Sequence, residues 1–286
     1  ATIIGLGLSG IAFSGSDIGG FQGNPTPELY VRWFQCASFV MFCRTHSSNS
    51  VEHRSPWTYG EPSVSIIRQF LQLRYRLLPY LYTLSWEATQ TGYPPVRPVF
   101  WADPTDAALW DVEDAFLLGD ALLVCPVVEA GGRSRSITLP KGHWYNYWDD
   151  TLLMGATTVS LDAPLEQIPL LVKAGTALPM EEDNHLTLHL YPATAPSQTT
   201  LYSDAGDGDG AMRLDRFHVH RQDQGMAIEW HSEGEFAFPY TGVTLQLHAG
   251  ELLQAWVDDR EVECKENRVG CDRPFHRAHL RMKHEG

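Results

Sequence analysis

Two short loops near the start of the chain carry side chains that could bind a polar ligand. The first loop holds the carboxylate of Asp17 and the ring of Phe21, with glycines between them that permit tight backbone turns. The second loop holds the guanidinium of Arg44 and the imidazole of His46. A neutral imidazole both donates and accepts a hydrogen bond, and an aromatic ring can pack on the C–H face of a sugar. Each residue alone also suits a structural role, such as a turn for Asp17, packing for Phe21 or a satisfied histidine for His46.

The elements around these loops read as two consecutive βα units. A short apolar run at residues 10–14 precedes the first loop, and a second run at residues 39–43 precedes the other. Helical patterns follow at residues 28–37 and at about residues 62–91, with a kink expected at Pro79. We therefore expect each loop to join the end of a strand to a helix.

Two βα units do not make an independent domain, because a parallel strand needs neighbours and cover on both faces. In an eight-unit barrel, the chemistry lies in the loops at the carboxyl ends of the strands. We therefore expect an N-terminal barrel segment upstream of Ala1, as a missing partner of this chain, and ligand contacts in the loops after Ser14 and Cys43.

Beyond Pro94 and Pro95 the pattern changes to short β-type runs separated by turn residues. These runs predict antiparallel sheets packed as sandwiches, and the acidic stretch from Glu181 to Asp183 predicts a break between two β modules. The expected domains are residues 1–94 from the barrel, 95–183 as a proximal β-sandwich and 184–286 as a distal β domain. The expected strands lie at residues 96–101, 116–128, 136–139, 143–148, 157–161, 169–172, 186–191, 199–202, 226–230, 243–248 and 253–257.

Composition excludes several classes of protein and of partner. The 286 residues are 43% hydrophobic, which is enough for a packed core and excludes disorder. The formal net charge of -14 argues against nucleic acid or an anionic membrane as a partner. No apolar run approaches the roughly 18–20 residues that cross a bilayer. The five cysteines are odd in number, and apolar surroundings at Cys36, Cys43 and Cys125 favour a reducing, cytoplasmic compartment.

Two further clusters suggest metal sites but fit them poorly. Asp204, Asp207 and Asp209 do not keep the alternating spacing of a calcium loop, so an acidic turn is favoured. Cys264 and Cys271 are spaced more widely than compact zinc motifs, which leaves a local disulfide or free thiols as the preferred interpretation. We expect no metal site.

The two loops together resemble glycoside hydrolase family 31. Residues 15–21 (GSDIGGF) resemble the family's G-x-D-I-G-G-F motif after the seventh barrel strand, and residues 44–46 (RTH) resemble its R-x-H motif after the eighth. Residues 27–35 (PELYVRWFQ) look like the helix between these motifs, and residues 68–82 look like the last barrel helix. The resemblance covers about residues 1–210 well and the rest only by general pattern.

The resemblance implies a retaining α-glycosidase, which needs a carboxylate nucleophile and a carboxyl acid/base. In the family these are aspartates after the fourth and sixth barrel strands, so neither lies in this chain and Asp17 takes neither role. What carries over is substrate binding, with Phe21 lining the subsite of the cleaved sugar and His46 similar to the histidine that bonds its hydroxyls. Asp17 and Arg44 are expected to support that subsite. The implied substrate is an oligosaccharide or α-glucoside, and no cofactor is implied.

Within the family, the Arg44-to-Ser47 loop looks more like the α-glucosidase pattern than the α-xylosidase one. A non-catalytic carbohydrate-binding or scaffolding β protein is the alternative from another class. A phosphate-binding barrel fragment is less favoured, because no lysine follows the glycine-rich loop and Asp17 would repel the ligand.

Overall fold

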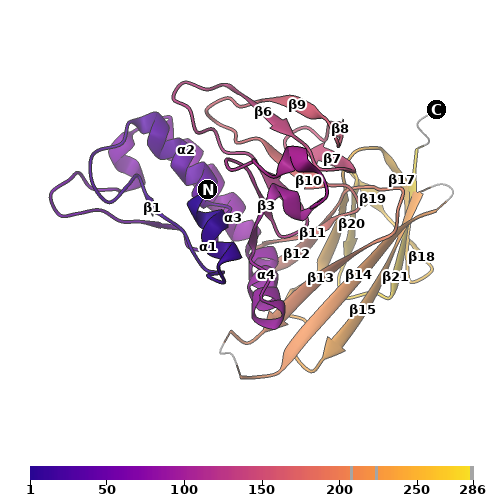
Figure 1. Cartoon of the computed structure of the whole chain (residues 1–286). Helices are drawn as coiled ribbons and strands as arrows, with labels where there is room; N and C mark the ends of the chain where they lie inside the picture. The colour runs from indigo at the N-terminus through magenta and orange to yellow at the C-terminus, as the bar shows by residue number, and fades with distance from the viewer. Residues whose placement is uncertain (207–208, 223–224, 284–286) are drawn as a thin grey trace. The chain divides into compact units, whose positions relative to one another are not determined.

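The computed structural model describes residues 1–206, 209–222 and 225–283 (Figure 1). The chain divides into two compact units, each made of segments that are not contiguous in sequence. Unit 1 comprises residues 1–75, 87–148 and 153–171, and unit 2 comprises residues 76–86, 149–152 and 172–286. The division into residues 1–94, 95–183 and 184–286 stays a prediction.

Unit 1 begins with helices around a small parallel sheet. Strand β1 (Asp17–Ile18) pairs in parallel with β2 (Arg44–Thr45), so that Asp17 lies opposite Arg44. A helix follows each strand, as expected for two βα units. The elements up to the end of this helical region are α1 (Thr2–Leu8), α2 (Pro27–Ala37), η1 (Pro56–Tyr59), α3 (Ser63–Arg76) and α4 (Leu78–Thr91).

The strands expected at residues 10–14 and 39–43 are wrong in position, because neither of these described segments forms a strand. The first amide groups of each segment instead complete the end of the preceding helix, while the Phe42 N–H donates to the Ser14 carbonyl at 3.3 Å. The N–H of Ile11 donates to the carbonyl of Leu6 at 2.9 Å, and the N–H of Phe39 donates to the carbonyl of Cys36 at 3.1 Å. Apolar composition alone cannot distinguish a strand from the last turn of a helix, and here the helix ends take those residues.

Helix α2 forms within one residue of the helical pattern expected at residues 28–37. The Thr26 hydroxyl accepts a hydrogen bond from the Leu29 N–H at 3.2 Å, and Pro27 occupies the first turn, where its missing N–H costs nothing. The buried face of α2 includes Tyr30, Val31 and Phe34. This helix connects the first loop to the second and fixes their spacing.

The helical pattern at residues 62–91 is two helices rather than one kinked helix. Helix α3 ends at Arg76 and α4 begins at Leu78, with Pro79 at its second position. A proline lacks an N–H and is tolerated in the first turn of a helix, so it begins a new helix here instead of bending the old one. Gly92, with a φ of +76°, follows the end of α4.

The strands from β3 to β10 form a six-stranded sheet in the order β3-β4-β5-β10-β7-β8 and a two-stranded sheet of β6 and β9. Their shared core includes Leu117, Leu123, Ile137 and Leu171, and Trp144 is buried among them. The elements are β3 (Val96–Pro98), η2 (Val99–Trp101), η3 (Ala107–Leu109), β4 (Phe116–Leu118), β5 (Leu122–Val124), β6 (Ser134–Thr138), β7 (His143–Asn146), β8 (Leu152–Met154), β9 (Thr158–Asp162) and β10 (Leu170–Lys173).

Unit 2 is a β-sandwich. One sheet has the order β11-β12-β16-β20-β19 and the other the order β13-β14-β15-β21-β17-β18, and their inner faces share one core that includes Leu188, Leu245, Phe217 and Ile228. The strands are β11 (Ala177–Glu182), β12 (His185–Leu190), β13 (Ser197–Asp204), β14 (Met212–Gln222), β15 (Gly225–Gly234), β16 (Val243–Leu247), β17 (Leu252–Val257), β18 (Arg260–Val262), β19 (Cys264–Lys265), β20 (Arg268–Cys271) and β21 (Arg277–Met282).

Most neighbours in these sheets are antiparallel, and the β12–β16 pair is parallel. The acidic stretch from Glu181 to Asp183, where a break was expected, ends in a two-residue turn in which Asp183 and Asn184 take positive φ values of 52° and 62°. This turn joins β11 and β12 as a hairpin. Part of α4 belongs to unit 2, where the Thr83 hydroxyl accepts a hydrogen bond from the Tyr202 N–H of β13 at 3.0 Å.

A buried histidine in unit 2 predicts a loss of stability in acid. His189 is 8% exposed, and burial, with nearby His248, Arg76 and Arg268, lowers its pKa from 6.5 to about 3. Its Nδ1 lies 2.8 Å from Nε2 of His248, whose Nδ1 lies 2.8 Å from a carboxylate oxygen of Asp150. Below pH 6.5 the unfolded chain binds a proton at residue 189 that the folded chain does not, so acid favours unfolding.

We therefore expect the His189 contribution to be full above pH 6.5 and to fall progressively toward pH 3, by about 3 kcal/mol near pH 4.5. Urea denaturation at several pH values would measure this slope. His189→Gln should flatten it, whereas Tyr191→Phe, which keeps the ring stacked on His248 at 4.3 Å, should not. An unchanged slope in His189→Gln would contradict the assignment.

Candidate functional site

The parallel pairing of β1 and β2 brings Asp17 and Arg44 together. Nε of Arg44 donates to a carboxylate oxygen of Asp17 at 2.9 Å, and the guanidinium also lies 5.1 Å from the centroid of the Phe42 ring. The Arg44 side chain is 49% exposed and that of Asp17 is 23% exposed. Asp17 therefore neutralises Arg44 and holds the two loops at a fixed distance, while the guanidinium keeps an exposed side.

Phe21 and His46 lie beside each other on the same two loops. Their ring centroids are 5.5 Å apart with an interplanar angle of 32°, and both side chains are exposed. The Ser48 N–H donates to the Phe21 carbonyl at 2.8 Å, which ties the second loop to the first. The structure thus places all four predicted residues in one region of unit 1, as an ion pair and a ring pair.

The first loop can pass this close to the second because it contains glycine. A Cβ on Gly15 would lie 1.9 Å from the Phe42 carbonyl oxygen, which no side chain could accept without a backbone shift. Gly19 has a φ of +85°, and a Cβ there would lie 2.9 Å from the Tyr30 ring. The glycines of this loop are therefore needed for the geometry that sets Phe21 beside His46.

Sequence analysis missed Arg54, whose side chain holds the first loop through hydrogen bonds to its backbone. Its side chain is buried and donates to backbone carbonyls of Gly20, Gly23 and Glu52. The hydroxyl of Tyr30 in turn donates to the Arg54 carbonyl, and burial raises the pKa of this phenol. The only signal in the sequence is one arginine in a polar loop, and a charge in a polar loop ordinarily indicates a solvated residue.

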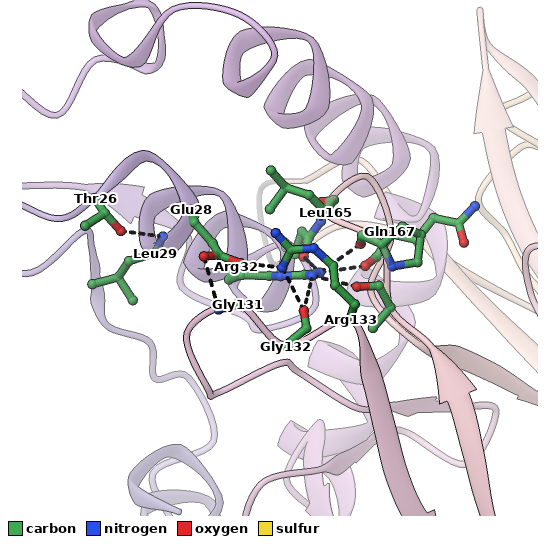
Figure 2. A network of polar contacts seen from close by, with 12 residues as sticks. Thr26, Glu28, Leu29, Arg32, Gly131, Gly132, Arg133, Leu165 and Gln167 are labelled. Atoms are coloured by element: carbon green, nitrogen blue, oxygen red, sulfur yellow. Dashed lines mark hydrogen bonds and ion pairs between the residues drawn. The ribbon is translucent and has the colours of Figure 1, made fainter.

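Two residues of α2 fix the helix that follows the first loop. The Trp33 indole donates to the Ser16 hydroxyl at 2.8 Å, so the loop is attached directly to the helix. Arg32, which is 6% exposed, directs its guanidinium at carbonyls in two distant turns (Figure 2). Its acceptors are the carbonyl oxygens of Gly132 at 3.1 Å, Ala163 at 2.7 Å, Pro164 at 3.1 Å and Gln167 at 2.8 Å.

Charged and amide side chains of α2 extend the same network (Figure 2). Arg133 donates to Glu28 at 2.5 Å, and this hydrogen bond is the main cause that lowers the pKa of the Glu28 carboxyl. The Gly131 N–H also donates to Glu28, at 3.2 Å, and the Gln35 amide donates to the Leu165 carbonyl at 2.6 Å. Helix α2 is thereby locked to the turns at residues 131–133 and 163–167, all within unit 1.

The clusters that resembled metal sites are organised differently. Within residues 1–206, 209–222 and 225–283, no group of three or more His, Cys, Asp or Glu residues is placed to hold a metal ion. Asp204 accepts hydrogen bonds from the Tyr82 and Tyr202 hydroxyls, each at 2.7 Å, and from the Gly206 N–H. Asp207 lies outside the described residues. Cys264 and Cys271 are free thiols, and burial raises the pKa of Cys271 to about 11.

In the described part of the chain, none of the helices combines the length and the apolar composition that a bilayer span requires.

Two family comparisons match most of the first two thirds of the chain. Residues 1–84 match the glycosyl hydrolases family 31 TIM-barrel domain, and residues 92–178 match the glycosyl hydrolase family 31 C-terminal domain. The loops with Asp17, Phe21, Arg44 and His46 fall within the first of these matches.

Two relatives extend the similarity. Alpha-glucosidase 2 of Bacillus thermoamyloliquefaciens is 33% identical over 269 residues, which cover 90% of this chain and 34% of the relative. A probable glucan 1,3-alpha-glucosidase of Arabidopsis thaliana is 44% identical over 216 residues, which cover 71% of this chain and 24% of the relative. The chain thus spans about a third or less of the length of these relatives.

A solved structure shows the same fold. The GH31 dextranase of Flavobacterium johnsoniae, complexed with glucose, superposes with a TM-score of 0.87 at 25% identity. The match covers 98% of this chain and 41% of the dextranase.

Proposed function

Because the chain belongs to glycoside hydrolase family 31, we propose that it is the C-terminal part of an enzyme that hydrolyses terminal non-reducing α-glucosidic bonds with retention. The observation that carries this proposal is the exposed pair of Phe21 and His46 at the carboxyl ends of two parallel strands. Relatives that match most of this chain are α-glucosidases, which favours glucose over other sugars.

In the proposed site, Phe21 and His46 bind the sugar that is released. The Phe21 ring offers an apolar face for the C–H groups of a pyranose, while the His46 imidazole can bond its hydroxyls. Asp17 and Arg44 act through their ion pair, which keeps the two loops in register, and Arg54 holds the first loop. None of these groups is a nucleophile or an acid/base for the glycosidic bond.

The two carboxyl groups that retention requires come, in this proposal, from an N-terminal barrel segment outside this sequence. One observation from the structure and one from the relatives support this. Strands β1 and β2 form a sheet of only two described strands, and matched relatives are about three or more times as long. A parallel sheet of two short strands needs further neighbours for stability.

The contacts of α2 argue against the alternative, a carbohydrate-binding or scaffolding β protein with vestigial helices. Three side chains of α2, those of Glu28, Arg32 and Gln35, form hydrogen bonds with the turns at residues 131–133 and 163–167. The region of strands β3 to β10 therefore supports the helix that follows the first loop of the candidate site. A β region that binds sugar by itself would not need to hold that helix.

Release of p-nitrophenol from an aryl α-glucoside tests the proposal. We expect no turnover by residues 1–286 alone, because both reactive carboxyl groups are elsewhere, and ready turnover when the upstream sequence is included. An aryl α-xyloside in the same assay tests the α-xylosidase alternative. Turnover by the isolated chain, or its absence in a folded longer form with both substrates, would contradict the proposal.

A further inference from the structure

The outer face of the second sheet of unit 2 carries a depression of about 690 Å³, which is a volume typical of small-molecule sites. It lies over β14, β15, β21 and β17, far along the sequence from the loops of the candidate site. Its lining combines one large aromatic ring, Trp256, with Gly225, Met226, Leu280 and four polar residues. The polar residues that line it are Gln222, Asp259, His279 and Arg281.

Strand register explains why these side chains share one face. Trp256 of β17 pairs with His279 of β21, and His279 pairs with Ala227 of β15. Residues paired across neighbouring strands project from the same side of a sheet, so the three form one row. The alternation of burial along β21 agrees, because Ala278 and Leu280 are buried in the core while His279 is partly exposed.

The parallel row beside it contains Gln222, Gly225 and Arg281, which also pair in register. The two positions that β15 contributes to these rows are therefore Gly225 and Ala227, with no side chain or a single methyl group. A Cβ on Gly225 would lie 1.8 Å from the Leu280 carbonyl oxygen of β21, so the close approach of β15 and β21 beside the depression requires glycine at this position.

The polar groups are held in defined states. The amide oxygen of Gln222 can only accept, so Nδ1 of His279, 2.9 Å away, must donate and Nε2 is left as an acceptor in the neutral ring. Burial, followed by the charge of Arg277, lowers the pKa of His279 and favours this neutral form. Arg281 donates to the Gln254 amide oxygen at 3.0 Å.

Other groups facing His279 from neighbouring elements are Asp259, Glu229 and His220. The carboxylate of Asp259 balances the guanidinium of Arg281 at the rim of the depression, in a chain with a net charge of -14. This balance of charge disfavours an anionic ligand, and the four polar side chains of the lining disfavour a purely apolar ligand. One flat ring beside several neutral or balanced hydrogen-bonding groups fits a neutral, polyhydroxylated ring.

We propose that this depression is a second saccharide-binding site, in which one pyranose ring of a neutral oligosaccharide packs on Trp256 and its hydroxyls bond Gln222, His279 and Asp259. The chemistry of the depression requires only a neutral saccharide. The choice of an α-glucan rests on the proposed function, because a site of this kind would hold the polymer whose ends the enzyme cleaves. Binding here would be weak, since the depression is open and its ligand would bury only one face.

Isothermal titration of the 286-residue chain with maltotetraose and with isomaltotriose tests this site. We expect dissociation constants in the millimolar range, about 1 mM. Trp256→Ala should raise the constant at least tenfold, and Trp256→Phe, which keeps an aromatic face, should stay within about threefold. Trp110→Ala is the matched control, because Trp110 is an exposed tryptophan of unit 1 and does not line the depression.

Asp259→Asn provides a second variant that should fold. Asp259 has a φ of +63° in the turn between β17 and β18, and asparagine tolerates that conformation while losing the charge. It should weaken binding severalfold. Wild-type chain that binds neither saccharide at 10 mM, or equal binding by wild type and a folded Trp256→Ala, would overturn the proposal.

The results separate this site from the proposed function. Binding that depends on Trp256, in a protein whose longer form cleaves no α-glucoside, would keep the site and reject the function. Cleavage of the α-glucoside by the longer form, without saccharide binding that depends on Trp256, would keep the function and reject the site. Phe21→Ala should leave binding at the depression unchanged, because Phe21 lies in a loop of unit 1 and the depression lies in unit 2.

Discussion

Replacing His46 by alanine in the longer, active enzyme is expected to lower kcat/KM by roughly 30- to 1,000-fold, or about 2–4 kcal/mol. The imidazole lies at the exposed edge of the ring pair with Phe21, where it can bond sugar hydroxyls. Such bonds strengthen as charge develops on the sugar at the transition state, so their loss affects kcat more than KM. Initial rates over a range of aryl α-glucoside concentrations would measure both constants.

A matched variant separates this effect from general damage to the loop. His53→Ala removes an exposed imidazole from the same loop region and should leave kcat/KM within about twofold, because His53 is not beside Phe21. His46→Asn, which keeps a donor and an acceptor, should recover part of the activity. An effect below about tenfold for His46→Ala would assign His46 a structural role instead.

The sequence alone predicted the elements whose signals are local. Helix α2 carries its cap at Thr26, its proline at the first position and a regular apolar face, so its range was predicted nearly to the residue. Many strands of the β regions were predicted for the same reason, since alternation and turn residues mark them directly. The expected ranges lack β8, β11, β14 and β18 to β21. The run expected at residues 96–101 is β3 followed by the 3-10 helix η2, and the run expected at 116–128 is the antiparallel pair β4 and β5.

Elements that depend on a distant partner were predicted less well. The runs at residues 10–14 and 39–43 are as apolar as a strand, but the preceding helices claim their amide groups, and the parallel pairing begins only at Asp17 and Arg44. A choice between helix end and strand depends on which carbonyl each N–H meets, and composition does not encode that.

The candidate site shows the same division. Phe21 and His46 were chosen through a family resemblance, because the types and spacing of these residues alone left ordinary packing open. Arg54 was missed because its partners are backbone carbonyls, which leave no mark on side-chain pattern. Arg32 stood within a recognised motif, yet its acceptors lie about 100–135 residues further along the chain.

Arg32→Leu is expected to lower the free energy of unfolding of unit 1 by about 3–5 kcal/mol. Leucine fills part of the volume but leaves the carbonyls of Gly132, Ala163 and Gln167 without their shared donor in a buried position. Each buried acceptor that loses its partner costs about 1–3 kcal/mol. Arg32→Lys should recover less than half of the loss, because one ammonium cannot match the fork of donors that reaches both turns.

Urea denaturation followed by circular dichroism measures these losses, and Arg133→Leu is the control from the same network. Arg133 is 53% exposed and bonds Glu28 at the surface, so its removal should cost less than about 1 kcal/mol. If Arg32→Leu were as mild as Arg133→Leu, the turns at residues 131–133 and 163–167 would not depend on α2 for their hydrogen bonds. Because Trp33 of the same helix holds Ser16 of the first loop, the loss in Arg32→Leu should also reduce saccharide binding at Phe21 and His46.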